Sequence, residues 1–156
     1  MTKRKAIVVA AIGVAAAAIF GVTALATPGG GLVGTTPIRG TIAGDVHLNA
    51  DRIKFQTKGN TDVVVQTITY DPGGFSGWHT HPGFVLGTIE SGAVTIQVGC
   101  STNTYSVGQS FYETGTDPIM ARNLGATPAV VRASFIVPQG VATRRDVPAS
   151  QIPHCS

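Results

Sequence analysis

The stretch of the sequence best suited to chemistry contains two histidines one residue apart, His79 and His81, followed directly by Pro82 and Gly83. On an extended chain, residues i and i+2 point to the same side with their Cα atoms about 7 Å apart, so both imidazoles can reach one ion. Imidazole is a ligand for zinc, copper, iron and nickel. The same spacing also occurs in surface or hydrogen-bonded histidines, so the spacing alone leaves a metal site and a structural pair both open.

Two histidines supply only half of a four-coordinate shell, so tight metal binding requires ligands from elsewhere in the chain. Glu113, at the end of a predicted strand, is the candidate that we favour, and Asp117 and His47 are alternatives. Glu90 has the opposite strand parity from the histidines and is expected to face away from them. The predicted metal site therefore combines Glu113 with the two histidines, and its cofactor would be a divalent transition-metal ion such as Zn, Fe, Mn, Cu or Ni.

Short apolar stretches separated by turn residues run along most of the chain. Apolar and polar side chains alternate in residues 94–98 and 131–137, and residues 61–70 are rich in Val, Thr and Ile, all of which is typical of β-strands. Turn residues follow at 71–74, which are Asp-Pro-Gly-Gly, and at 99–104. Strands spaced by about ten residues must close on one another to bury their apolar faces, which predicts an all-β sandwich or barrel over residues 46–156.

Other side chains with chemical potential have simpler interpretations. Trp78 has the opposite parity from the histidines and is expected to pack in the core or at a sheet edge. Arg122 is expected to face solvent, although inside a barrel it would hold a carboxylate. Residues 144–146, Arg-Arg-Asp, are interpreted as a solvated charge cluster without a function.

The composition indicates one compact domain that does not bind nucleic acid. The chain has 156 residues, of which 43% are hydrophobic, 12% are charged and 20 are glycine; this argues against disorder and against two domains. The net charge is +3, but three of the 11 basic residues lie at positions 3–5, and the chain after residue 26 carries eight basic and eight acidic side chains. No basic run remains that could follow a phosphate backbone.

The first 26 residues have the pattern of a signal peptide. A positive segment at 2–5 precedes an uncharged, alanine-rich stretch that ends in Ala24-Leu25-Ala26, which matches an A-x-A cleavage site. We expect cleavage after Ala26 and a location in the periplasm, the cell envelope or outside the cell, with no membrane association afterwards; an uncleaved anchor is the alternative. Residues 27–45, rich in Gly and Pro, are expected to form a flexible lead-in.

Two cysteines, Cys100 and Cys155, both follow the predicted signal peptide. In an oxidising compartment, two thiols in a small domain usually pair, so a disulfide is the simplest interpretation. A metal-binding pair or a catalytic thiol is less well supported, because only His154 lies close to either cysteine in the sequence.

Residues 60–140 resemble the cupin superfamily, in particular small secreted cupins built on one barrel. The first cupin motif places a glycine before His-x-His and another after it, which corresponds here to Gly73 or Gly74, His79, His81 and Gly92. For the second motif, Gly108, Gly115 and Asn123 keep the spacing, and the sequence then continues to Thr127-Pro128-Ala129. The resemblance implies a double-stranded β-helix barrel with a metal or a ligand inside.

Two of the four metal ligands that the resemblance implies are replaced by apolar residues. The motif glutamate falls on Val85 and the second-motif histidine on Ile119. The function that we favour is therefore an exported cupin that binds a metal ion, a small ligand or both, and need not be catalytic. The residues expected to line its pocket, besides the histidines, are Val85, Ile89, Ile119 and Phe135.

Two alternatives stay open. One is a metal-dependent dioxygenase, isomerase or lyase with a site formed by His79, His81 and Glu113, and this hypothesis fails if Glu113 points away from the histidines. The other is a barrel whose histidines are structural remnants. Exposed strand edges would also permit a homodimer.

Overall fold

Thirteen β-strands and one short 3-10 helix make up the regular structure of residues 28–155, the residues that this computed structural model describes. The predicted signal peptide at 1–26 lies outside these residues. The elements are β1 (Gly30–Gly34), β2 (Ile38–Ile42), β3 (His47–Ala50), β4 (Ile53–Gln56), β5 (Thr61–Phe75), β6 (His79–Thr80), β7 (Phe84–Ser91), β8 (Ala93–Val98), β9 (Ser101–Ser106), β10 (Ser110–Thr114), β11 (Ile119–Arg122), β12 (Ala129–Pro138), β13 (Arg145–Asp146) and η1 (Ala149–Gln151).

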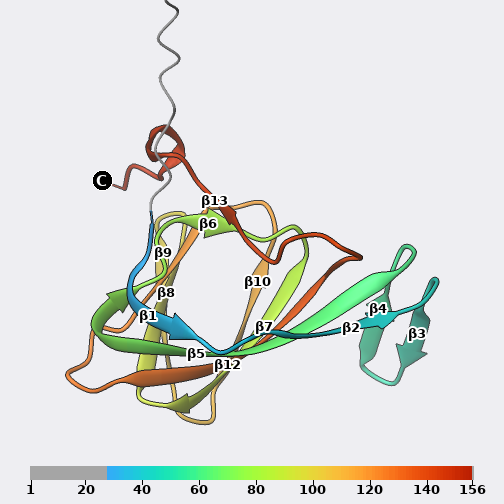
Figure 1. The fold of residues 1–156 in the computed structure, drawn as a ribbon, viewed down its shortest axis with the longest axis horizontal. Helices are drawn as coiled ribbons and strands as arrows, with labels where there is room; N and C mark the ends of the chain where they lie inside the picture. The colour runs from blue at the N-terminus through green and yellow to red at the C-terminus, as the bar shows by residue number, and fades with distance from the viewer. Residues whose placement is uncertain (1–27, 156) are drawn as a thin grey trace, which may run out of the picture.

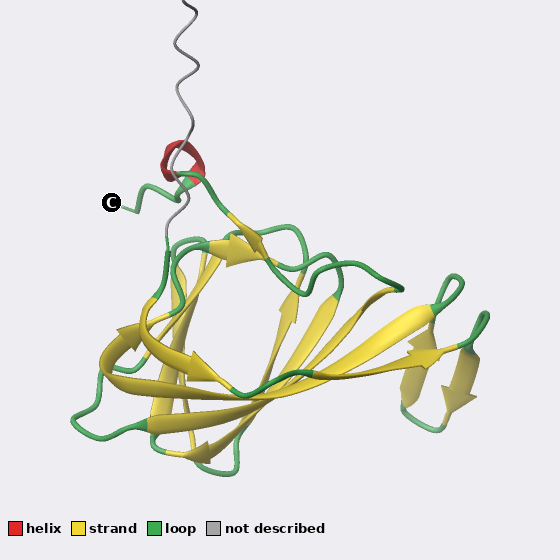
Figure 2. Cartoon of the chain, in the orientation of Figure 1, coloured by secondary structure: helices red, strands yellow, loops and turns green. Residues whose placement is uncertain are grey.

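Eleven of the strands form one antiparallel sheet that curls into a nearly closed barrel (Figures 1 and 2). Its main path is β10-β7-β12-β5-β11-β6-β13; β1 and β2 pair with β5, β8 pairs with β11, and β9 pairs with β8. β3 and β4 form a separate hairpin that projects from one side of the barrel (Figure 2). The all-β fold predicted from the strand spacing and the barrel implied by the cupin resemblance are both confirmed.

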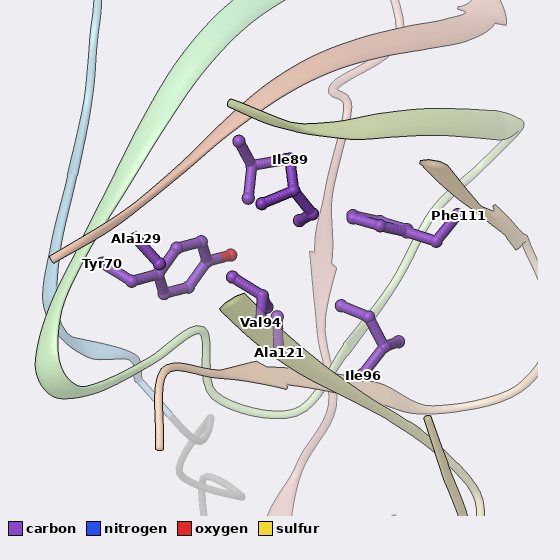
Figure 3. Packing of buried hydrophobic residues seen from close by; sticks show 8 residues of the cluster. Tyr70, Ile89, Val94, Ile96, Phe111, Ala121 and Ala129 are labelled. Atoms are coloured by element: carbon purple, nitrogen blue, oxygen red, sulfur yellow. The ribbon is translucent and has the colours of Figure 1, made fainter. Parts of the chain in front are cut away.

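The alternation along β12 shows why this sequence forms a barrel strand. Val131, Ala133, Phe135 and Val137 are buried, whereas Arg132 between them is exposed. Their side chains join two buried clusters, one of which surrounds the ring of Tyr70 (Figure 3). Figure 3 shows the Tyr70 hydroxyl directed inward, between the side chains of Ile89 and Val94.

The turn predicted at residues 71–74 is wrong. These residues continue β5, which bends sharply and runs on to Phe75 (Figure 1). Gly73 has a φ of 75°, which glycine adopts without strain, and a side chain on Gly74 would meet the carbonyl oxygen of Gly31 at 2.1 Å. The two glycines therefore let the strand bend closely around β1 and do not end it.

Two further segments that were expected to lack strands are paired. The lead-in at 27–45 contains β1 and β2, which add to the edge of β5, so the expectation of a flexible segment is wrong. The turn expected at 99–104 is mostly β9, which pairs with β8. Nearly every residue of these three strands is exposed or half-buried, so they lack the apolar alternation that marks the central strands.

Residues 139–155, called the C-terminal strap below, return across the end of the barrel that carries β6 (Figure 1). Within the strap, β13 pairs with β6 and places Asp146 opposite His79. The amide of Val147 donates to the carbonyl of Trp78 at 3.0 Å, and both side chains belong to a small buried cluster with Met120. Hydrogen bonds and apolar packing thus hold the strap against the strand that carries His79.

A disulfide joins the far end of the strap to the barrel. Cys155 is bonded to Cys100, which lies between β8 and β9, and the two are 55 residues apart in sequence. The predicted pairing is confirmed. Among the described residues, no helix is long and apolar enough to cross a membrane.

A buried aspartate ties the strap to β2 and β5 and makes stability depend on pH. Asp62 is 1% exposed, and its carboxylate accepts hydrogen bonds from the Thr41 hydroxyl at 2.6 Å, the Gly140 amide at 2.8 Å and the Arg39 guanidinium at 2.5 Å. These three hydrogen bonds lower the pKa of Asp62 from 3.8 to about 2, and the bond from Thr41 has the largest effect.

Stability should therefore fall as the pH drops from about 4 to about 2, because the unfolded chain takes up this proton first. In Asp62→Asn, that part of the acid dependence should be missing, and the protein should be less stable at neutral pH. Urea unfolding at several pH values measures both effects. Asp71→Asn, at an exposed position of the same strand, serves as the control and should keep the wild-type acid slope.

Candidate metal centre

Three buried side chains that can ligate a metal come together at the end of the barrel covered by the strap. His79 lies in β6, His81 directly follows that strand, and Glu113 lies in β10. One ligand atom from each lies within 4.8 Å of the other two, and each residue is at most 6% exposed. The three residues that the sequence analysis proposed as ligands are therefore neighbours in the fold.

The Nδ1 atom of His79 is used by the protein backbone. It lies 2.9 Å from the carbonyl oxygen of Gly77 and 3.4 Å from the hydroxyl of Ser76. A carbonyl can only accept, so Nδ1 carries the hydrogen and Nε2 keeps its lone pair. Burial, and secondarily the charge of Arg144, lower the pKa of His79 to about 3, so this imidazole is neutral at physiological pH.

His81 is oriented in the same way, by a residue of the strap. Its Nδ1 lies 2.6 Å from the carbonyl oxygen of Thr143, so the free lone pair is again on Nε2. That Nε2 atom lies 3.0 Å from Oε2 of Glu113, and it is a buried atom without a hydrogen-bond partner. Phe135 packs against the ring, with centroids 5.6 Å apart.

The geometry around His81 fits a bound cation. An imidazole nitrogen whose hydrogen is on the other ring nitrogen and a carboxylate oxygen both present lone pairs, so at 3.0 Å a proton or a metal ion between them makes the contact favourable. Two imidazoles and one carboxylate are a donor set for zinc, iron and related ions. A site with three protein ligands also leaves coordination positions open to other molecules.

Strand register places Glu113 beside the position of the missing family ligand. Glu113 is paired directly across β10 and β7 with Val85, the position at which the cupin motif would place its glutamate. Directly paired residues of neighbouring strands point to the same face of a sheet. The carboxylate thus reaches the same side of the barrel from the adjacent strand. Ile119, at the position of the second-motif histidine, is paired with His79.

A close approach of backbones brings Glu113 near His81. Gly115 follows β10, and a side-chain carbon there would meet the carbonyl oxygen of His81 at 2.3 Å. Only glycine fits at this distance, so Gly115 allows the end of β10 to lie against the histidine segment. Gly115 also belongs to the glycine spacing noted in the sequence.

The three candidate ligands form one wall of a cavity of about 180 Å³ inside the barrel. Of the predicted pocket residues, Val85 and Phe135 line this cavity. Ile89 and Ile119 are each 1% exposed and belong to the packed interior instead. The sequence analysis missed Thr143, Arg144 and Tyr70, which also line the cavity.

The other residues considered as ligands lie elsewhere. His47 is on the projecting hairpin and Asp117 is exposed, so neither joins the cluster. Glu90 is exposed, as its parity predicted, and it pairs with Arg132. Trp78 is buried in packing, and Arg122 is exposed, both as expected.

The family model of the cupin domain matches residues 66–138, a range that contains all three candidate ligands. Residues 66–138 of the chain form a cupin domain. The match also covers β7, β10 and β12, which surround the cavity of this cupin. No curated protein matches its sequence.

Solved structures with a similar fold include several bacterial and fungal proteins. A Thermus thermophilus protein is 22% identical over 49% of this cupin and 72% of its own chain, with a TM-score of 0.45. A predicted oxalate decarboxylase from Thermotoga maritima is 18% identical over 51% of this cupin and 82% of its own chain, with a TM-score of 0.44. The cupin domain of Cnp3 from Schizosaccharomyces pombe is 10% identical over 58% and 61%, also with a TM-score of 0.44.

Proposed function

We propose that this cupin binds one divalent transition-metal ion through His79, His81 and Glu113 and holds a small ligand in the adjoining cavity. The observation that carries this proposal is the unpartnered Nε2 atom of His81, buried 3.0 Å from the carboxylate of Glu113. A buried polar atom without a partner costs free energy, and a cation between these two atoms removes that cost.

A bound ion would be held by the two Nε2 atoms and the Glu113 carboxylate, and it would supply Lewis acidity toward a ligand in the cavity. The chain itself orients both imidazoles through the carbonyls of Gly77 and Thr143. The wall of the adjoining cavity is largely apolar. These properties serve a module that binds and releases a ligand as well as they serve an enzyme.

A metal-dependent enzyme is the second candidate, and the direction of Glu113 favours it. Glu113 faces the histidines, so the geometric condition that this hypothesis had to meet is fulfilled. Two histidines and a carboxylate with open positions form the donor set of many oxygen-dependent enzymes. Oxygen uptake by the metal-loaded protein in the presence of small organic substrates would separate this candidate from a binding module.

We further propose that residues 1–26 direct export and are removed. The disulfide between Cys100 and Cys155 fits an extracellular or periplasmic location, because such bonds persist in oxidising compartments. Mass spectrometry of the protein recovered from a secreting host tests the cleavage site after Ala26.

The deciding experiment is elemental analysis of the protein, purified without chelators or a histidine tag, before and after incubation with each ion. Near-stoichiometric Zn, Fe, Mn, Cu or Ni in the wild type, and its loss from both His79→Ala and His81→Ala, would support the proposal. The absence of metal after every incubation, or its retention in either variant, would overturn the site.

A further inference from the structure

The sequence analysis interpreted residues 144–146 as a solvated charge cluster. For Arg144, which lies in the C-terminal strap, this interpretation is wrong. Its side chain is 33% exposed and lines the cavity that also contains His79, His81 and Glu113. Its Nε donates to Oδ1 of Asp146 at 2.5 Å. This bond, together with the pairing of β13 with β6, fixes the position of the guanidinium at the cavity wall.

The bond to Asp146 uses only one edge of the guanidinium. Within residues 28–155, no protein group pairs with Nη1 or Nη2 of Arg144, so that edge keeps two parallel donors for another partner.

The other residues of the cavity wall indicate what the uncharged part of a ligand must be. Most of it is apolar, with Val131, Ala133 and Phe135 contributed by β12. The hydroxyl of Tyr70 also faces inward, and no described residue forms a hydrogen bond with it (Figure 3). A volume of about 180 Å³ is below the 300–1,000 Å³ of sites that bind drug-sized molecules, so the ligand has only a few carbon atoms.

We propose that the cavity binds a small carboxylate, with the carboxylate group on the Nη edge of Arg144 and a short carbon chain against the apolar wall. A planar carboxylate matches the guanidinium fork with two parallel hydrogen bonds, whereas a neutral amide offers one acceptor and brings no charge. The Arg144 contact does not use the metal ion. The inference deepens the proposed function by naming the ligand class, and can be tested separately from it.

The test is isothermal titration calorimetry of the full-length protein with acetate, propionate and butyrate, and with the three matching amides. Wild type is compared with Arg144→Gln and with Arg145→Gln. The latter removes the neighbouring arginine, which is exposed and does not line the cavity. We expect at least one acid to bind the wild type more tightly than its amide does. Affinity for that acid should fall roughly 10- to 100-fold in Arg144→Gln and remain unchanged in Arg145→Gln.

Arg144→Lys is the second variant, because it keeps the charge and loses the fork; its affinity should lie between those of wild type and Arg144→Gln. Equal binding of acid and amide by the wild type, an unchanged affinity in Arg144→Gln, or no binding of any acid by the wild type would each overturn the inference. The metal content of the wild type decides the proposed function independently. A metal-loaded protein that ignores carboxylates would refute only the ligand class.

Discussion

Glu113→Gln should remove stoichiometric metal binding while the barrel stays folded. Glutamine has nearly the same size and shape as glutamate, so the packing at the end of β10 is kept. It has no negative charge to offset that of the cation, and its amide is a poor ligand for a transition metal. Substitution of residues that only hydrogen-bond to metal ligands commonly lowers metal affinity by roughly 10- to 100-fold. The loss of a ligand itself should therefore lower the affinity by more than about 100-fold. Metal titration followed by calorimetry measures this loss.

Glu90→Gln is the matched control for this variant. Glu90 lies on the neighbouring strand β7, outside the barrel, where it pairs with Arg132. The Glu90→Gln variant should bind metal as the wild type does. Without metal, Glu113→Gln should melt at the same temperature as the wild type or higher, because it no longer buries a carboxylate facing the His81 lone pair. If Glu113→Gln bound metal with the affinity of the wild type, the carboxylate of Glu113 would not be a metal ligand.

Cys100→Ser should produce the largest loss of stability. The disulfide joins residues 55 apart, and loop-closure entropy alone would then contribute about 4 kcal/mol to the free energy of unfolding, as an upper figure. For a domain of this size, the melting temperature should fall by roughly 10 °C. Below the transition, metal content should stay at the wild-type level, because β13 and Val147 hold the site half of the strap independently of Cys155. Differential scanning calorimetry and elemental analysis of the same sample measure the two quantities.

Reductant provides the control for the disulfide. Treating the wild type with a phosphine should lower its melting temperature to that of Cys100→Ser, and the same treatment should leave the variant unchanged. An identical melting temperature of oxidised wild type and variant would show that the bond does not stabilise the fold.

The barrel and the histidine pair could be predicted because both depend on local pattern. Alternation along residues 131–137 identifies a strand with one buried face, and an i, i+2 spacing places two imidazoles on one side of any extended chain. Glu113 was proposed as a ligand because it lies at the end of a predicted strand. Its pairing with Val85 across β7 and β10 depends on a register that links residues 28 apart, which no local pattern specifies.

The parts that escaped prediction depend on distant partners. β1 and β2 have too few apolar residues to be recognised, and they form because the edge of β5 supplies their hydrogen bonds. Arg144 and Asp146 look like a surface ion pair in the sequence. Their place at the cavity follows only from the pairing of β13 with β6, some 65 residues earlier in the chain.

The contact between Thr143 and His81 has a consequence for the order in which the protein matures. The carbonyl that sets the imidazole orientation follows both histidines and Glu113 in the sequence, and Thr143 lies 62 positions after His81. Chains emerge from their N-terminus during synthesis, and contacts between distant residues form late in folding. If the proposed ion binds here, a chain from which Thr143 has not yet emerged lacks the carbonyl that orients His81, and it should hold the ion less tightly. Metal uptake would then report that the strap, as well as the barrel, is in place.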